Sequence, residues 1–245
     1  HTNQIGQEKC LAVVGVRLSE LPPVGECLEL EDLEPIELAP VTKSNQHVVY
    51  EQLEANVAKT GVPRAILGDH GSDLSGGVKR FRQAHPETAN LYDISHKAAR
   101  LLKARLERDD RWSRFCTQVG QTKFQTQQTE LAFLVPPNQR SKARYMNLGR
   151  LLSWANDTRK TLQSRPAEVL AHCTVERLEE KFGWLREYDD ALQEWSEYQS
   201  LLEKSVDFIR RNGYSTDASR ELSARLMPQV RTDAGQILAD ELVTF

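Results

Sequence analysis

Asp69 and its neighbours form the part of this sequence whose residue types best suit chemistry. The segment Arg64–Leu74 reads RAILGDHGSDL, a short apolar run that predicts a strand, then an aspartate, then Gly71, which permits a sharp exit. Active sites of open α/β folds gather at strand ends, and carboxylate clusters there can hold two divalent ions, about 4 Å apart, for phosphodiester chemistry. We therefore take Asp69 as the candidate catalytic and metal-binding residue. In an isolated Asp-x-Gly, a hydrogen bond within the turn is the commoner role, and Asp73 is expected to cap the helix starting near Leu74.

A second polar group follows the next expected strand, Ala89–Tyr92. Asp93 and His96 leave this strand and enter a helix, where they could support a metal site or simply hold the strand end by hydrogen bonding. Basic residues then recur about every third position on one expected helical face, which suits phosphates or solvent alone. The DNA-contact candidates on this face are Lys97, Arg100 and Lys103.

Two more segments carry candidate residues. The segment PPNQRSKARYMN places basic side chains near Tyr145, which suits nucleic-acid contact through charge and stacking or, equally, a helix start with Tyr145 in the core. Its candidates are Arg140, Lys142 and Arg144. In FGWLREYDDALQEW, Glu187 is the only candidate for a third catalytic acid, while Trp184 and Trp195 predict a packing stripe beside a solvated acidic face.

The elements that must position these residues alternate between strand and helix in the first part of the chain. A hairpin is expected from two strands, Cys10–Leu18 and Cys27–Val41, with Pro35 at a bulge or a sheet edge. A helix over Gln46–Thr60 is expected to end at Gly61. The remaining expected elements are a strand over Arg64–Leu67, a helix over Leu74–His85 and a strand over Ala89–Tyr92.

Beyond His96 the pattern is helical, because Gly and Pro become sparse and Leu, Ala, Arg, Glu and Gln recur at helical spacing. Breaks are expected at Pro136–Pro137, Ser164–Pro166, Asn212–Gly213 and Pro228, and Glu176–Arg211 suggests a helical hairpin or one long helix. The predicted fold class is α+β: an α/β-type core with a mixed, RNase H-like sheet over residues 1–97, followed by an all-helical insertion domain over residues 98–245.

Composition narrows the classes of protein. The chain has 245 residues, of which 39% are hydrophobic, so it can bury a core. No apolar run approaches the roughly 20 residues of a membrane helix. The four cysteines are far apart and indicate neither a zinc knuckle nor a disulfide framework, so we expect reduced thiols in a cytoplasmic protein. Because the net charge is −3, any DNA-binding surface must be local.

Several passages resemble one family, the DDE-type transposases of bacterial insertion sequences, in a group common in cyanobacteria. The matching passages are KCLAVVGVRLSELPP, DLEPIELAPV, YEQLEANVAKTGVPRAILGDHGSDL, LYDISHKAARLLK and PPNQRSKARYMN. The resemblance implies an RNase H-like catalytic core in which Asp69 is the second acid of the triad, supported by Asp93 and His96. It places the first aspartate directly before His1 and the final glutamate in a pattern that does not occur before Phe245. We therefore expect an internal fragment that is inactive alone.

The same resemblance implies an activity and partners. The full-length form would cleave DNA and transfer strands at the ends of the element, using a two-metal site with Mg²⁺ or Mn²⁺. Its partners would be the transposon ends and target DNA, on which it would assemble as a homo-oligomer associated with the nucleoid. One alternative is a non-catalytic DNA-binding or interaction remnant without a complete acidic triad. A cellular nuclease of the same fold is a further alternative.

Overall fold

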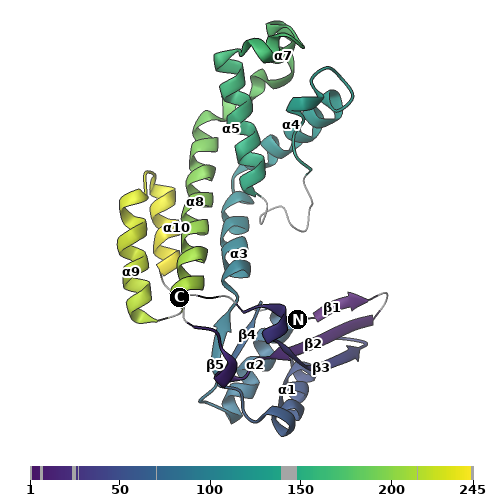
Figure 1. Ribbon diagram of the computed structural model, residues 1–245, viewed down its shortest axis with the longest axis vertical. Coiled ribbons are helices and arrows are strands. Elements are labelled where there is room, and N and C mark those ends of the chain that lie inside the picture. The colour runs from purple at the N-terminus through teal and green to yellow at the C-terminus, as the bar shows by residue number, and fades with distance from the viewer. Residues whose placement is uncertain are drawn as a thin grey trace. The chain divides into compact units, whose positions relative to one another are not determined.

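The computed structural model describes residues 2–5, 8–23, 26, 28–69, 71–138, 148–213 and 215–243, with side chains from Cys10 onward. The chain divides into two compact units (Figure 1). Unit 1 comprises His1–Lys97 and Ile209–Gly213, and unit 2 comprises Ala98–Phe208 and Tyr214–Phe245. All strands of the described residues lie in unit 1, and helices predominate over the chain as a whole. The fold is therefore α+β, as expected, with a small strand content.

A three-stranded antiparallel sheet opens unit 1. Its strands are β1 (Thr2–Ile5), β2 (Glu8–Gly15) and β3 (Glu34–Val41), in the spatial order β1-β2-β3. The expected hairpin between the second and third of these strands is confirmed. The register shifts where Val13 pairs with Glu37 and Val14 pairs with Pro35. Pro35 thus lies beside a bulge in an edge strand, where its missing N–H costs no ladder hydrogen bond.

Both hairpin strands are shorter than predicted. The first ends at Gly15 rather than Leu18, and a 3-10 turn follows at Leu18–Glu20. The second begins at Glu34 because Leu30–Asp32 forms another 3-10 turn, whereas Cys27 lies outside the described residues. In this turn the Glu29 N–H donates to Asp32 Oδ2 over 2.7 Å. Such local side-chain bonds compete with the strand ladder, which is why the apolar alternation of this segment misled the prediction.

The rest of unit 1 is a parallel strand pair with two helices. Strand β4 (Ala65–Gly68) pairs with β5 (Ala89–Tyr92), and α2 (Ser72–Ala84) connects them. Helix α1 has both predicted ends, Gln46–Thr60: the Asn45 side chain caps its start, and Gly61, at φ 75°, ends it. The two helices pack closely, since a Cβ on Gly77 would lie 2.5 Å from Val49 Cγ1.

Unit 2 is helical, and the expected breaks are confirmed. Helix α5 (Leu148–Ser164) ends at an expected break, Gly213 follows the end of α8 (Asp189–Asn212) with φ 71°, and Pro228 lies in a 3-10 turn. The segment Glu176–Arg211 is not a single helix, because the 3-10 turn Gly183–Tyr188 separates two helices. The helices that begin after β5 are α3 (Ile94–Leu106), α4 (Asp110–Thr126), α5 (Leu148–Ser164), α6 (Ala167–Leu170), α7 (Val175–Phe182), α8 (Asp189–Asn212), α9 (Thr216–Leu226) and α10 (Asp233–Val243).

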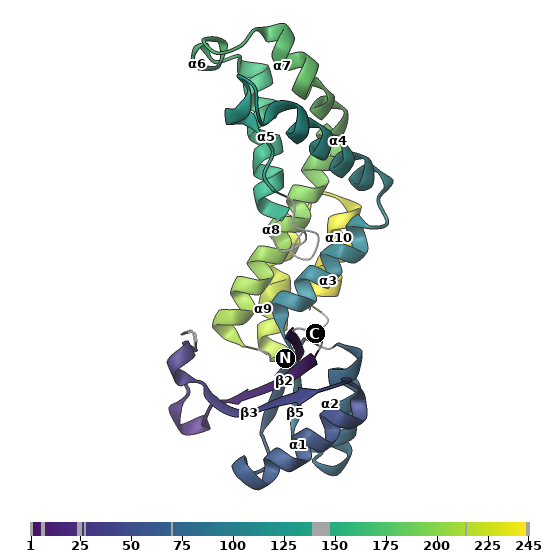
Figure 2. The ribbon, with the colours of Figure 1, turned by 90° about the vertical axis from the view of Figure 1, so that its right-hand side faces the viewer.

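Helices α4 and α8 belong to unit 2 (Figure 2), and aromatic side chains from both helices meet in its core. Phe115 and Trp195 are fully buried, and their ring centroids lie 5.2 Å apart. Trp112 meets Trp195 edge-on at 5.1 Å. The half-buried Trp184 donates from Nε1 to Thr122 Oγ1 over 3.0 Å. The predicted packing role of Trp184 and Trp195 is confirmed. Across the described part of the chain, no helix is both long and apolar enough to cross a bilayer.

Candidate functional site

The ends of β4 and β5 bring two aspartates to one edge of the parallel pair. Gly68 and Tyr92 are register partners at the end of the two strands. The pairing continues one step further, because the Asp93 N–H donates to the Gly68 carbonyl over 2.9 Å. Neighbouring strands lie about 4.8 Å apart, so Asp69 and Asp93, each directly following its strand, leave the sheet side by side. This edge is the carboxyl end of the pair, where α/β sites form.

Asp69 makes a turn of its own at this edge. Its Oδ1 accepts a hydrogen bond from the Gly71 N–H over 2.9 Å, and the side chain is half-buried. The turn-forming role that an isolated Asp-x-Gly suggests is therefore present. A Cβ on Gly71 would lie 3.3 Å from Asp69 Oδ1 and 3.2 Å from Asp73 Oδ1. The bare glycine is what lets these two carboxylates converge on the same short loop.

Asp73 does not cap α2 as predicted. The helix starts at Ser72, two residues earlier than predicted, with Gly71 in the cap position and no side-chain cap, so Asp73 falls in the first turn. Its Oδ1 accepts from the Leu74 N–H over 3.0 Å, and its other oxygen bonds the Ser44 hydroxyl. A carboxylate in the first turn still interacts favourably with the helix dipole. Asp73 therefore ties the loop before α1 to the start of α2.

Asp93 and His96 form a closed pair at the start of α3. Asp93 Oδ2 lies 2.7 Å from His96 Nδ1, and Asp93 Oδ1 accepts from the Ser95 N–H over 2.8 Å. Burial opposes the ionisation of Asp93, but the hydrogen bonds from His96 and Ser95 outweigh it and lower the pKa of Asp93. The carboxylate is thus ionised at neutral pH and holds the first turn of the helix in place.

The remaining predicted residues are distributed over both units. Lys97 is half-buried, with Nζ 5.8 Å from the centroid of the Tyr92 ring. Arg100 and Lys103 are exposed on α3 in unit 2, and Lys103 pairs with Glu107 at 3.7 Å. Glu187 is also in unit 2, exposed on the 3-10 turn before α8. Three of the predicted DNA-contact residues lie outside the described residues: Arg140, Lys142 and Arg144.

The donor atoms at the strand edge suit a hard cation in part. Mg²⁺ prefers oxygen ligands and is commonly held by one or two carboxylates together with water and substrate phosphates. Asp69 supplies such a carboxylate, whereas both oxygens of Asp93 are engaged by Ser95 and His96. Over the described residues, no group of three or more His, Cys, Asp or Glu side chains is placed to hold a metal ion. The edge therefore fits one carboxylate ligand and a supporting pair, and does not by itself form a two-ion cage.

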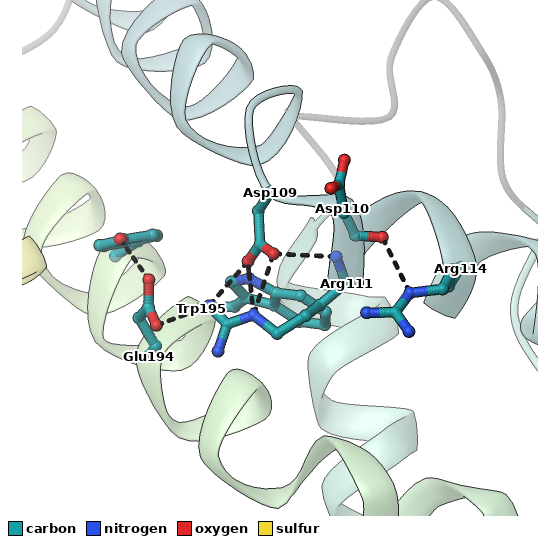
Figure 3. Close-up of polar contacts among 7 residues, drawn as sticks. Asp109, Asp110, Arg111, Arg114, Glu194 and Trp195 are labelled. Atoms are coloured by element: carbon teal, nitrogen blue, oxygen red, sulfur yellow. Dashed lines mark hydrogen bonds and ion pairs between the residues drawn. The ribbon is translucent and has the colours of Figure 1, made fainter.

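A second polar cluster, absent from the sequence-based candidates, lies within unit 2 (Figure 3). Arg111 bridges two carboxylates from distant parts of the chain, with Nη2 lying 2.8 Å from both Asp109 Oδ2 and Glu194 Oε2. Trp195 Nε1 donates to Asp109 over 3.0 Å, and the Tyr198 hydroxyl donates to Glu194 over 2.6 Å. Glu194 is one of the acids of the FGWLREYDDALQEW segment, which was expected to form a solvated face, but it is half-buried in this network.

The cluster has a structural explanation. Asp109 is the N-cap of α4, accepting from the Arg111 N–H over 2.9 Å, and the pattern of an Asp before an apolar-periodic run could have revealed that role. Burial opposes the ionisation of Asp109, but hydrogen bonds from Arg111 and Trp195 lower its pKa. Burial and the bond to Glu194 raise the pKa of Tyr198. Together these contacts fasten the α3–α4 corner to α8.

No family model, curated protein or solved structure matches the chain. The function must therefore be argued from the residues at the strand edge and from the topology that places them.

Proposed function

We propose that this chain is part of a DDE-type DNA transposase, which cleaves DNA and joins strands at the ends of an insertion sequence with divalent metal ions. One observation carries the proposal. Asp69 and Asp93 directly follow neighbouring parallel strands at the same edge. A hydrogen bond of 2.9 Å from the Asp93 N–H to the Gly68 carbonyl joins the two strand ends. Metal-dependent phosphodiester chemistry needs carboxylate ligands, and such sites form at strand ends of this kind, where Asp69 is the proposed ligand and Asp93 its support.

The order of elements supports an RNase H-like core. An antiparallel sheet β1-β2-β3 is followed by α1 and then by the parallel pair β4-β5 with its connecting helix. If the outer edge of β1 paired with β4, one mixed sheet in the order β3-β2-β1-β4-β5 would result. The pairings among the described residues form two separate sheets. The single mixed sheet is therefore part of the proposal.

Each residue at the edge has a distinct proposed role. Asp69 is the metal ligand, and its turn with Gly71 fixes where the carboxylate stands. Asp93 and His96 position the edge by locking the end of β5 onto α3. Mg²⁺ or Mn²⁺, when bound, would supply the positive charge that stabilises attacking and leaving oxygens. The proposed partners are the transposon ends and the target DNA, with a homo-oligomer forming on DNA.

The decisive test is Asp69→Asn in the protein that carries this chain. We expect strand cleavage at the element ends to fall by about 100-fold or more, which is the scale of losing one preorganised group that stabilises the charge of the transition state, while binding to those ends changes little. Asp217→Asn is the matched control, because Asp217 is an exposed acid paired with Arg220 on α9. Cleavage by Asp69→Asn at the rate of the control would refute the assignment.

A non-catalytic DNA-binding or interaction remnant is the second candidate. It is favoured by one observation, that no group of three metal-binding side chains occurs over the residues that the structure describes. Salt-dependent DNA binding without cleavage in either Mg²⁺ or Mn²⁺ would select it. Cleavage without joining would instead indicate a nuclease.

A further inference from the structure

Arg210 brings a positive charge to the edge that carries Asp69 and Asp93. The segment Ile209–Gly213, which contains the last turn of α8, belongs to unit 1 together with both strands of the parallel pair. Arg210 is exposed, and its Nη2 donates to the Ser95 hydroxyl over 2.9 Å. The Ser95 N–H in turn donates to Asp93 Oδ1 over 2.8 Å. Two hydrogen bonds therefore connect the guanidinium to the carboxylate edge.

A phosphodiester that reaches this edge meets negative charge. Asp69 and Asp73 converge on the loop around Gly71. Asp93 directly follows the neighbouring strand and is ionised at neutral pH. Like charges close to one another repel, so a nearby cation must offset this repulsion before a phosphate can bind at the edge. Lys97 already lies over the ring of Tyr92. Arg210 is tied by a hydrogen bond to Ser95, whose backbone N–H donates to Asp93.

The chemistry of arginine suits this task better than that of lysine. A guanidinium carries five N–H donors in a planar fork that matches two oxygens of a phosphate. The bond to Ser95 uses one of these donors and limits the rotation of the side chain. A side chain already oriented in this way loses less conformational freedom when a ligand arrives.

We infer that Arg210 binds a backbone phosphate of the DNA that enters the Asp69–Asp93 edge, and that Ser95 orients it. The inference rests on the proposed function and adds to it a residue from the far end of α8. Arg210 is a binding residue in this scheme and takes no part in proton or metal chemistry. The ligand class is the phosphodiester of a DNA duplex.

The test is the salt dependence of binding to a DNA duplex by the full chain. Each phosphate contact contributes about 0.9 to the slope of log K against log salt. Arg210→Ala is therefore expected to reduce this slope by about 0.9, and Arg210→Gln, which keeps length and hydrogen-bonding capacity, is expected to do the same. Arg210→Lys should keep the slope. Arg220→Ala is the matched control, since Arg220 is an exposed arginine on α9 that pairs with Asp217.

The variants are first shown to fold like the unsubstituted chain. Circular dichroism and the thermal midpoint establish that the variants are folded, as expected for an exposed side chain. A slope for Arg210→Ala and Arg210→Gln equal to that of Arg220→Ala overturns the inference and leaves the proposed function standing. A reduced slope, combined with normal cleavage by Asp69→Asn, supports Arg210 as a phosphate ligand and removes the transposase assignment. If the unsubstituted chain shows no salt-dependent DNA binding, the inference fails.

Discussion

Arg111 shows how a single side chain can join two distant parts of the chain. It bonds Asp109 at the start of α4 and Glu194 on α8, whose relative exposures are only 16% and 23%. Asp109 and Glu194 also accept from Trp195 and Tyr198. Removing one member of such a network leaves the others partly buried with fewer partners, which costs more than the net value of the bond itself.

Arg111→Met is therefore expected to destabilise the chain by about 1–3 kcal/mol. Methionine keeps much of the apolar stem but leaves both carboxylates without their shared donor. The measurement is the midpoint of urea unfolding followed by circular dichroism. Arg220→Met, at an exposed ion pair, should change stability by less than about 0.5 kcal/mol. Equal midpoints for the two variants would show that the network contributes nothing to stability.

The same network predicts a dependence of stability on pH. Because the pKa of Asp109 is lowered in the folded state, its contribution is present above the unfolded pKa of about 3.9 and is lost as pH falls below it. Because the pKa of Tyr198 is raised, the folded state holds that proton more tightly, and stability falls as pH rises above about 10. Tyr198→Phe should weaken the alkaline loss of stability in urea titrations and leave the acid loss unchanged. An alkaline loss as steep in Tyr198→Phe as in the parent chain would contradict this assignment.

Among the elements, those with local boundary signals were predictable from the sequence. Helix α1 begins after Asn45, whose side chain caps its first turn, and ends before Gly61, which has a positive φ. Both residue types can be recognised in the sequence. The first half of the segment Cys27–Val41 was predicted wrongly as strand. A bond between Glu29 and Asp32, three residues apart, outweighs alternation there. The choice between such a turn and a strand depends on energies too similar for a pattern to separate.

The sequence predicted the individual residues of the candidate site but not how they are arranged in space. The sequence indicated Asp69, Asp93 and His96 because each follows an expected strand. That Asp69 and Asp93 lie side by side depends on the parallel register of β4 and β5, which no local pattern contains. The contact between Ser95 and Arg210 joins residues 115 positions apart, and the network around Arg111 joins residues 83 and 86 positions apart. Such contacts follow from the packing of whole elements.

The contact between α1 and α2 gives a prediction at the scale of elements. A Cβ on Gly77 would meet Val49 Cγ1 at 2.5 Å and the Gln46 carbonyl at 3.1 Å, so the helices would have to separate. Gly77→Ala should destabilise the chain by about 1–3 kcal/mol, the usual cost of overpacking, despite the higher helix propensity of alanine. Gly68→Ala is the control, because nothing lies within 4 Å of its added methyl. A stability gain in Gly77→Ala, measured by thermal unfolding, would show that the contact is looser than described.

At the scale of the whole molecule, unit 2 has a hydrophobic core of its own. Trp195, Phe115, Leu192 and Leu238 are fully buried and all belong to this unit. A core of large side chains drawn from several helices is what allows a domain to fold alone. The identities expected for the two parts, a catalytic core over residues 1–97 and a helical insertion over residues 98–245, remain predictions.

The autonomy of unit 2 can be tested with residues 98–245 expressed alone, a segment that retains the connection through Gly213. We expect a helical circular dichroism spectrum and a single cooperative urea transition, because the buried side chains of this core all lie within the segment. Trp195→Ala should lower the stability of the segment by about 3–5 kcal/mol, the usual cost of truncating a buried aromatic residue. It should do so by a similar amount in the full chain, since Trp195 contacts Trp112, Phe115 and Asp109 within the same unit. A segment that is helical but unfolds gradually, and in which Trp195→Ala changes nothing, would show that its packing depends on residues 1–97.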